Sequence, residues 1–224
     1  LKPIYITEQV NFDTDDPAIW IHPTDATKSI IIRTDKDTNG GLFAFDITGK
    51  IVNKVPNLKR PNNVDLRYGF VLNGQNIDIA ALTERETNKV KLYSLPELKE
   101  VGEFSVFDGE QQRSPMGISL YKNPESQEIY AIVGRKTGPS GSYLWQYKLV
   151  EKEGRITGEL VRKFGNFNGG KEIESIAVDD ALGYIYYSDE GFAVHQYYAD
   201  PNKGNNELLL FGKGDFKEDI EGIS

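Results

Sequence analysis

Short apolar runs alternate with polar turns along the whole chain. Four segments share one layout, in which an apolar run is followed by a charged or glycine-rich turn and then by an alternating aromatic run. These segments are IIIRTDKDTNGGLFAFDITGK from Ile30, DIAALTERETNKVKLYSLPELK from Asp78, IYAIVGRKTGPSGSYLWQYKL from Ile129 and YIYYSDEGFAVHQYYADPNKG from Tyr184. Runs of this length and period, bounded by Gly, Asn and Asp, predict β-hairpins.

A further strand is expected ahead of each hairpin. These strands read DDPAIWIHP, NNVDLRYGF, SPMGISLYK and EIESIAVDD, and a fifth copy, DIEGIS, ends the sequence. The unit recurs about every 50 residues, which is typical of a β-propeller. We therefore predict an all-β fold, a β-propeller of four-stranded blades, with about four blades and the start of a fifth. A β-sandwich also has regularly spaced strands, but it would not repeat a charge at one hairpin position.

Charged residues recur at two positions of the repeat. Lys36, Arg85, Lys136 and Glu190 each follow the first strand of a hairpin. Equivalent turns of successive blades surround one end of the central channel, so we expect these four residues on one rim. Acidic residues recur where the preceding strands begin: Asp15, Asp16, Glu172, Glu174, Asp219 and Glu221.

The chemistry of this rim depends on how its charges are neutralised. Each residue taken alone is equally well explained as solvated surface. Converging carboxylates, however, repel one another unless a hard cation neutralises them, and oxygen ligands without Cys and with few His favour Ca²⁺. Lysines and an arginine on the same rim indicate a phosphate site, because phosphoryl transfer is stabilised by positive charge around the phosphate oxygens.

Composition excludes several classes of function. The chain has 224 residues, a net charge of -8 and a pI of about 4.9, so its surface repels nucleic acid and anionic membranes. It has no cysteine, which excludes thiol catalysis and zinc–thiolate sites. No apolar run is long enough to span a membrane. The only two histidines, His22 and His195, suggest no catalytic triad and are expected to be surface or packing residues.

The stretch RTDKDTNGG, from Arg33 to Gly41, has more than one interpretation. Asp35, Asp37, Asn39 and Gly40 fit the spacing of a calcium-binding EF-hand loop. The flanking runs SIII and GLFAF are typical of strands, whereas an EF-hand loop lies between helices. We therefore predict a hairpin turn. A peripheral Ca²⁺ site on Asp35, Asp37 and Asn39 is an alternative that the sequence does not decide.

Several motifs in order resemble one family. DDPAIWIHP, NNVDLRYGFVLNG, DIAALTER, ESIAVDDALGYIYYSDE and DIEG are together similar to the β-propeller phytases, also called alkaline phytases, from about Asp15 to Ser224. The resemblance implies a six-bladed, calcium-dependent bacterial hydrolase of phosphomonoesters. It also implies secretion or a periplasmic location. The first residue, Leu1, suggests a processed or trimmed N-terminus. Residues 1–224 are therefore expected to form an incomplete propeller domain, truncated at the C-terminus or completed by further blades or a second propeller.

The resemblance also implies a role for individual residues. Calcium ligands are expected at Asp15, Asp16, Asn62, Glu174, Glu190, Asp219 and Glu221. Contacts with substrate phosphates are expected from Lys36, Arg85 and Lys136. The residues expected to carry catalysis are Asp16, Glu174, Glu190, Lys36, Arg85 and Lys136.

Three positions depart from the family pattern. Met116 stands where the family has a phosphate-binding tyrosine, Asp37 where it has a second lysine, and Glu84 where it often has asparagine. Each change removes phosphate-binding capacity or adds negative charge.

The expected function is a Ca²⁺-dependent hydrolysis of phytate (myo-inositol hexakisphosphate) or lower inositol phosphates by metal-activated water. A catalytically weak propeller that binds inositol phosphates or assists a partner domain is the main alternative. A calcium-dependent propeller lactonase is a third hypothesis, although a lactonase has no need of the lysines and arginine.

Overall fold

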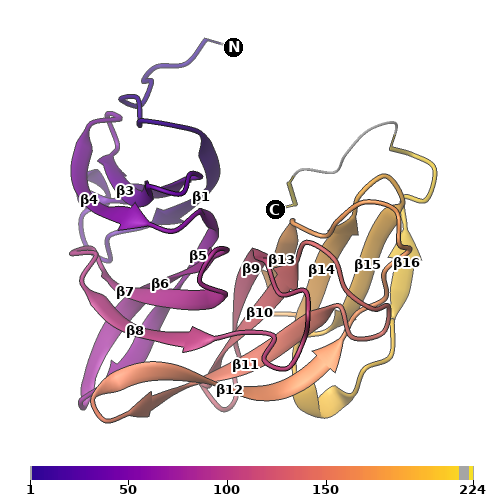
Figure 1. The fold of residues 1–224 in the computed structure, drawn as a ribbon. Coiled ribbons are helices and arrows are strands. Elements are labelled where there is room, and N and C mark those ends of the chain that lie inside the picture. The colour runs from indigo at the N-terminus through magenta and orange to yellow at the C-terminus, as the bar shows by residue number, and fades with distance from the viewer. Residues whose placement is uncertain (1, 217–221, 224) are drawn as a thin grey trace.

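A computed structural model describes residues 2–216, 222 and 223. The described chain folds into four consecutive antiparallel meanders of four strands each, which follow one another along an arc (Figure 1). Two short 3₁₀ helices, η1 (Ala26–Lys28) and η2 (Pro201–Lys203), lie in the connections. None of the helices found among these residues is long and apolar enough to cross a membrane.

The strand boundaries follow the repeat predicted from the sequence. The first sheet contains β1 (Thr14–Trp20), β2 (Ile30–Asp35), β3 (Gly40–Asp46) and β4 (Ile51–Leu58). The second contains β5 (Pro61–Leu72), β6 (Gln75–Glu84), β7 (Lys89–Leu95) and β8 (Glu100–Ser105). The third contains β9 (Pro115–Lys122), β10 (Ile129–Arg135), β11 (Leu144–Lys152) and β12 (Arg155–Phe164). The fourth contains β13 (Ile176–Asp179), β14 (Tyr184–Asp189), β15 (Ala193–Tyr198) and β16 (Leu209–Phe211).

The first strands of the four sheets pack side by side along the inside of the arc. Strand β5 packs against both β1 and β9, and β13 packs against β9. Side-chain hydrogen bonds also connect neighbouring sheets: Trp20 Nε1 donates to Asp78 Oδ2 at 2.8 Å, and Leu120 N donates to Asp65 Oδ2 at 2.7 Å. Meanders with their first strands around a common centre are the blades of a β-propeller, which confirms the predicted fold class. The expected fifth blade would begin at Asp219, outside the described residues.

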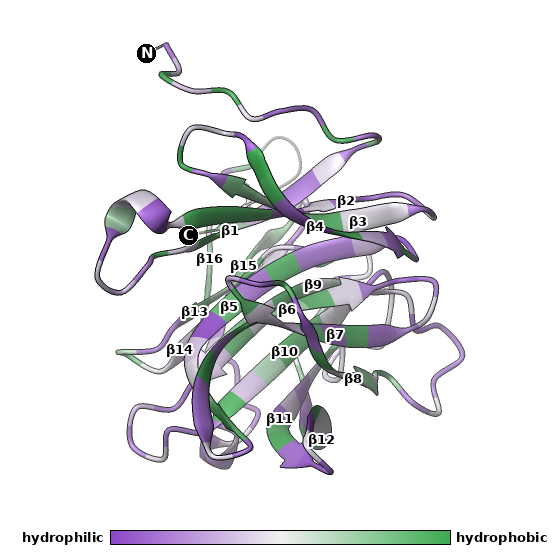
Figure 2. Cartoon of the chain, turned by 90° about the vertical axis from the view of Figure 1, so that its left-hand side faces the viewer, coloured by the Kyte–Doolittle hydropathy of each residue, from purple (hydrophilic) through white to green (hydrophobic). Residues whose placement is uncertain are grey.

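The core lies in three layers between neighbouring blades. Successive side chains of a strand point to opposite faces, so a strand between two blades buries both of its faces. In β6, Ile79 and Ala81 belong to the cluster shared with the third sheet, whereas Ala80 and Leu82 belong to the cluster shared with the first. This two-sided burial explains why such strands read as unbroken apolar runs, and Figure 2 shows apolar residues gathered in the strands.

The second and third blades also meet at their outer strands. One parallel pair, Gly102 with Ile156, joins β8 to β12 and turns the two blades into one eight-stranded sheet. A Cβ atom on Gly102 would lie only 2.0 Å from the backbone oxygen of Ile156. The close approach of these two backbones therefore requires glycine.

We predict that Gly102→Ala lowers the free energy of unfolding by about 1–3 kcal/mol, because the added methyl must push β12 away. Urea denaturation of the purified protein measures this loss. Gly222→Ala is the matched control, since a Cβ atom there meets no other atom within 4 Å. Equal transition midpoints for the two variants would contradict the account of the β8–β12 contact.

Candidate functional site

The charged residues of the repeat gather at one end of the inner strands. Each inner strand pairs antiparallel with the strand that follows it, so the start of the first lies beside the end of the second. Thr14 pairs with Asp35, Pro61 with Glu84, and Pro115 with Arg135. Lys36, Arg85 and Lys136, which follow the second strands, therefore lie at the same end as the acidic starts of the first strands. The predicted common rim is present.

Three carboxylates converge on this rim. One oxygen each from Glu172, Glu174 and Glu190 lies within 4.8 Å of the others. Two backbone bonds hold their segments together: Glu190 N donates to Glu172 O at 3.2 Å, and Ser188 N donates to Ser175 O at 3.0 Å. The side chain of Glu172 was not among the ligands expected from the sequence. Its place two residues before Glu174, on the same side of an extended segment, was the available signal.

A chain of buried amides links Glu174 to Asp16. Asn62 Nδ2 donates to Glu174 Oε1 and, at 2.7 Å, to Asn63 Oδ1. Asn63 Nδ2 in turn donates to Asp16 Oδ2 at 2.8 Å. The structure thus brings three of the expected ligands, Asp16, Asn62 and Glu174, into one connected group. Of the four other expected ligands, Glu190 lies in the carboxylate cluster and Asp15 contacts Lys36, whereas Asp219 and Glu221 lie outside the described residues.

Burial makes the negative charges of this group costly. Desolvation raises the pKa of Asp16, with a smaller contribution from the neighbouring Asp15 carboxylate, while the Asn63 hydrogen bond opposes the rise. Desolvation and Asp15 likewise raise the pKa of Glu174, against the hydrogen bond from Asn62. These carboxylates are therefore held together at an electrostatic cost, which a bound cation would offset.

The three cationic side chains already contact this acidic group. Lys36 Nζ lies 2.9 Å from Asp15 Oδ2, and Lys136 Nζ lies 2.8 Å from Glu172 Oε2. Arg85 Nη1 donates to Asn62 Oδ1 at 3.4 Å. Positive and negative groups thus alternate around the rim, within reach of one another.

The N-terminal segment fixes the position of Lys36. The buried Asp35 carboxylate accepts hydrogen bonds from Asn11 N at 3.3 Å and Phe12 N at 3.1 Å. Lys36 N donates to Asp13 O at 2.7 Å. The hairpin corner and the N-terminal segment are therefore interlocked. Because Asp35 is turned toward this segment, its carboxylate is already engaged away from the hairpin turn.

The three departures from the family pattern have structural partners here. Glu84 is only 2% exposed and accepts hydrogen bonds from Lys59 N at 2.7 Å and from the Thr87 hydroxyl. Asp37 Oδ1 caps the hairpin turn by accepting from Asn39 N at 3.0 Å. Met116 is 2% exposed, so its side chain offers no polar group to the rim.

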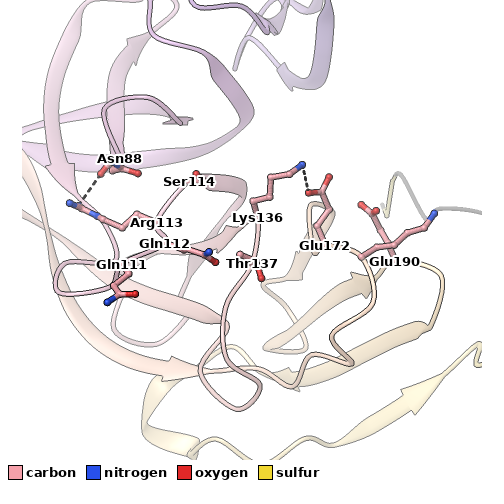
Figure 3. Close-up of a pocket in the computed structure, with 10 residues that line it drawn as sticks. Asn88, Gln111, Gln112, Arg113, Ser114, Lys136, Thr137, Glu172 and Glu190 are labelled. Carbon is pink, nitrogen blue, oxygen red and sulfur yellow. Dashed lines mark hydrogen bonds and ion pairs between the residues drawn. The ribbon is translucent and has the colours of Figure 1, made fainter.

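A cavity of about 840 Å³ opens beside the carboxylates. Its lining includes Lys136, Glu172 and Glu190 on one side and the loop of residues 111–114 on the other. Figure 3 shows the Lys136 ammonium turned toward the Glu172 carboxylate, whereas Arg113 points away toward Asn88. Arg113 is held by Asp108 at 2.6 Å and by Ser105, whereas Lys136 faces the Glu172 carboxylate in this view.

The fold and this rim together define a β-propeller protein with a mixed acidic and basic site at one end of its inner strands. The phytase family model matches residues 6–224, and the chain belongs to the phytase family. It is 33% identical over 219 residues to the 3-phytase of Bacillus subtilis (strain 168), covering 94% of this chain and 55% of that protein. The family resemblance seen in the sequence motifs is thereby confirmed.

The chain thus spans about half the length of this curated relative. Among solved structures, one described as the Dos1 propeller aligns with a TM-score of 0.49 and 15% sequence identity. That alignment covers 91% of this chain and 48% of the other.

We predict that Glu174→Gln weakens the pH dependence of stability in metal-free protein. Because the pKa of Glu174 is higher in the folded chain than its ordinary value of 4.5, its protonated form stabilises the fold. This stabilisation is present at low pH and is lost as pH rises through the raised pKa. Glutamine keeps an oxygen for the Asn62 amide but has no charge to lose.

The measurement is the melting temperature in chelator between about pH 4.5 and 7. Wild type should lose more stability over this range than Glu174→Gln. Glu125→Gln, a substitution at an exposed glutamate, should behave as wild type. Parallel curves for all three proteins would show that Glu174 is not under electrostatic strain.

Proposed function

We propose that this chain supplies the site of a calcium-dependent phosphomonoesterase that acts on phytate (myo-inositol hexakisphosphate) or lower inositol phosphates. The observation that carries the proposal is the meeting of Glu172, Glu174 and Glu190 with Lys36, Lys136 and Arg85 on one rim of a phytase-family propeller. Such a rim offers oxygen ligands to a metal and positive charge to phosphate oxygens.

The residues of the rim fit a calcium ion. Oxygen atoms from three carboxylates lie close enough to share one cation, and desolvation of the half-buried Glu174 makes neutralisation of its charge favourable. When bound, Ca²⁺ would bind phosphate oxygens and lower the pKa of a coordinated water. We assign the ligands to Asp15, Asp16, Asn62, Glu172, Glu174 and Glu190, with Asp219 and Glu221 as further ligands outside the described residues.

The cationic residues of the chain would bind and orient the substrate. Lys36 and Lys136 are each held by one carboxylate, so their ammonium groups are already turned toward the rim. Arg85 adds a planar group that can bind two phosphate oxygens at once. In this mechanism, the phosphate is fixed for in-line attack by water, and no covalent enzyme intermediate forms. Asp16, Glu174 and Glu190 would orient that water.

The proposal extends to the context of the chain. Residues 1–224 would form a phytase-like propeller domain that works with further blades or with a second propeller domain. A secreted or periplasmic protein is part of the same proposal. Support comes from the curated 3-phytase relative, whose matched part is 55% of its length.

Binding without turnover is the second candidate function. The observation that favours it is the structural engagement of Glu84, Asp37 and Met116, which leaves the rim with fewer phosphate contacts than the family pattern. Such a protein would hold inositol phosphates or assist a partner domain.

We predict that the full-length protein releases inorganic phosphate from inositol hexakisphosphate in the presence of Ca²⁺, and that a chelator abolishes the release. Loss is expected because the clustered carboxylates would repel phosphate once the cation is removed. A phosphate-release assay with parallel calorimetry checks both functions. Tight binding without release would favour the second candidate. The absence of both binding and release would contradict both candidate functions.

We predict that Lys36→Ala lowers kcat/KM by about 10- to 100-fold, because a hydrogen bond between charged groups contributes about 1.5–3 kcal/mol. Lys136→Ala should have an effect of similar size. Lys54→Ala serves as the control, since Lys54 is exposed on the outer strand β4. If all three variants kept wild-type kcat/KM, the assignment of the phosphate contacts would be wrong.

A further inference from the structure

A buried histidine lies between two carboxylates just behind the rim. His195 is 3% exposed, and its ring stacks on Tyr187 with a centroid distance of 4.6 Å and an interplanar angle of 11°. Its Nδ1 lies 2.6 Å from Glu207 Oε1, and its Nε2 lies 3.4 Å from Asp189 Oδ2. Both ring nitrogens therefore face an acidic oxygen, an arrangement that simple packing does not require.

The Asp189 carboxylate joins this histidine to the segment that carries the rim glutamates. Asp189 is fully buried and accepts hydrogen bonds from Asn168 N at 2.7 Å and Asn168 Nδ2 at 2.9 Å. Asn168 lies in the connection from β12 to β13, which continues into Glu172 and Glu174. Its own Oδ1 accepts from Gly170 N at 2.6 Å, so the turn is closed on itself.

Asp189 is also connected directly to the rim. Glu190 follows Asp189 directly, and its backbone N–H donates to Glu172 O. A displacement of Asp189 would therefore move Glu190 and would release the segment that holds Glu172. Asp189 thus joins the two sources of the carboxylate cluster through a buried side chain, as the Tyr187 hydroxyl also does by donating to Asn166 O at 2.8 Å.

A fully buried carboxylate needs more than two neutral donors. Its desolvation is costly unless a positively charged or strongly donating group lies beside it. Of the described basic side chains, His195 alone lies within ion-pair distance of Asp189. Glu207 on the far side of the ring fixes the ring's orientation, and Tyr187 fixes its plane. The ring is therefore held with Nε2 at ion-pair distance from Asp189, although Nε2 makes no hydrogen bond among the described residues.

We propose that His195 is a positioning residue for the rim carboxylates: it holds Asp189, and through Asp189 it fixes the 166–172 segment and Glu190 in one arrangement. The effect of this arrangement on calcium binding rests on the proposed function. The effect on the segment itself does not depend on any metal.

The metal-independent part is tested by hydrogen exchange of the full-length protein in chelator. In His195→Gln, peptides covering residues 166–174 should exchange about tenfold faster than in wild type. The matched control is Ile185→Val, which weakens the core of the same sheet without touching Asp189. Unchanged exchange in His195→Gln, or an equal increase in Ile185→Val, would overturn the proposal.

The metal-dependent part is tested by calorimetric titration with Ca²⁺ alone. His195→Gln should bind Ca²⁺ about 10- to 100-fold more weakly, the usual effect of removing a group that orients a ligand. Ile185→Val and His22→Gln should keep wild-type affinity, because Ile185 lies in the core and His22 caps a turn through its Nδ1 and packs against Trp20. Wild-type affinity in His195→Gln would overturn the positioning of the metal ligands.

The outcomes separate this inference from the proposed function. If wild type binds no Ca²⁺, the metal assignment fails, and hydrogen exchange alone decides the role of His195. If His195→Gln does not fold, Glu207→Gln replaces it, since this variant leaves the ring in place but weakens its anchor. Glu207→Gln should change exchange and Ca²⁺ affinity in the same direction by a smaller factor. No change in either would overturn the proposal.

Discussion

Antiparallel pairing between the first two strands of each sheet is the constraint on which the site depends. It places the start of one strand beside the end of the next in every blade, as in the pairs of Thr14 with Asp35 and Pro61 with Glu84. Packing of the inner strands then brings these ends together around one centre. The strand arrangement alone therefore makes neighbours of residues that are far apart in the sequence. Asn62 and Glu174, which share a hydrogen bond, are 112 positions apart.

The arrangement concentrates negative charge where the fold has to tolerate it. Buried amides from Asn62 and Asn63, together with the ammonium groups of Lys36 and Lys136, offset only part of the cost of these carboxylates. The same lysines are the groups proposed to bind phosphate. A cation bound to the carboxylates would release the lysines from their ion pairs and leave them available to an anionic ligand. The same side chains therefore contribute to the stability of the rim and to its proposed chemistry. His195 and Asp189 extend this dependence into the core behind it.

Much of the fold could be predicted from the sequence, because the blades repeat. Strands that are buried on both faces have unbroken apolar runs, such as IAAL in β6. The charged residues at the hairpin ends recur at the same position of each repeat. The rim was therefore predictable from spacing alone. Most pairwise contacts were not: no pattern indicates that Glu84 accepts from Lys59 N or that His195 lies between two carboxylates. These contacts depend on loop paths between blades, which have no periodicity.

The central claim is that one rim holds a calcium ion on its carboxylates and phosphate on its lysines and arginine. A crystal structure of the full-length protein with Ca²⁺ and the non-hydrolysable analogue inositol hexakissulfate tests it most directly. The account predicts anomalous density for calcium between Glu174 and Glu190, with sulfate groups on Lys36, Arg85 and Lys136. Calcium bound only elsewhere, or sulfate bound away from these three side chains, would contradict it.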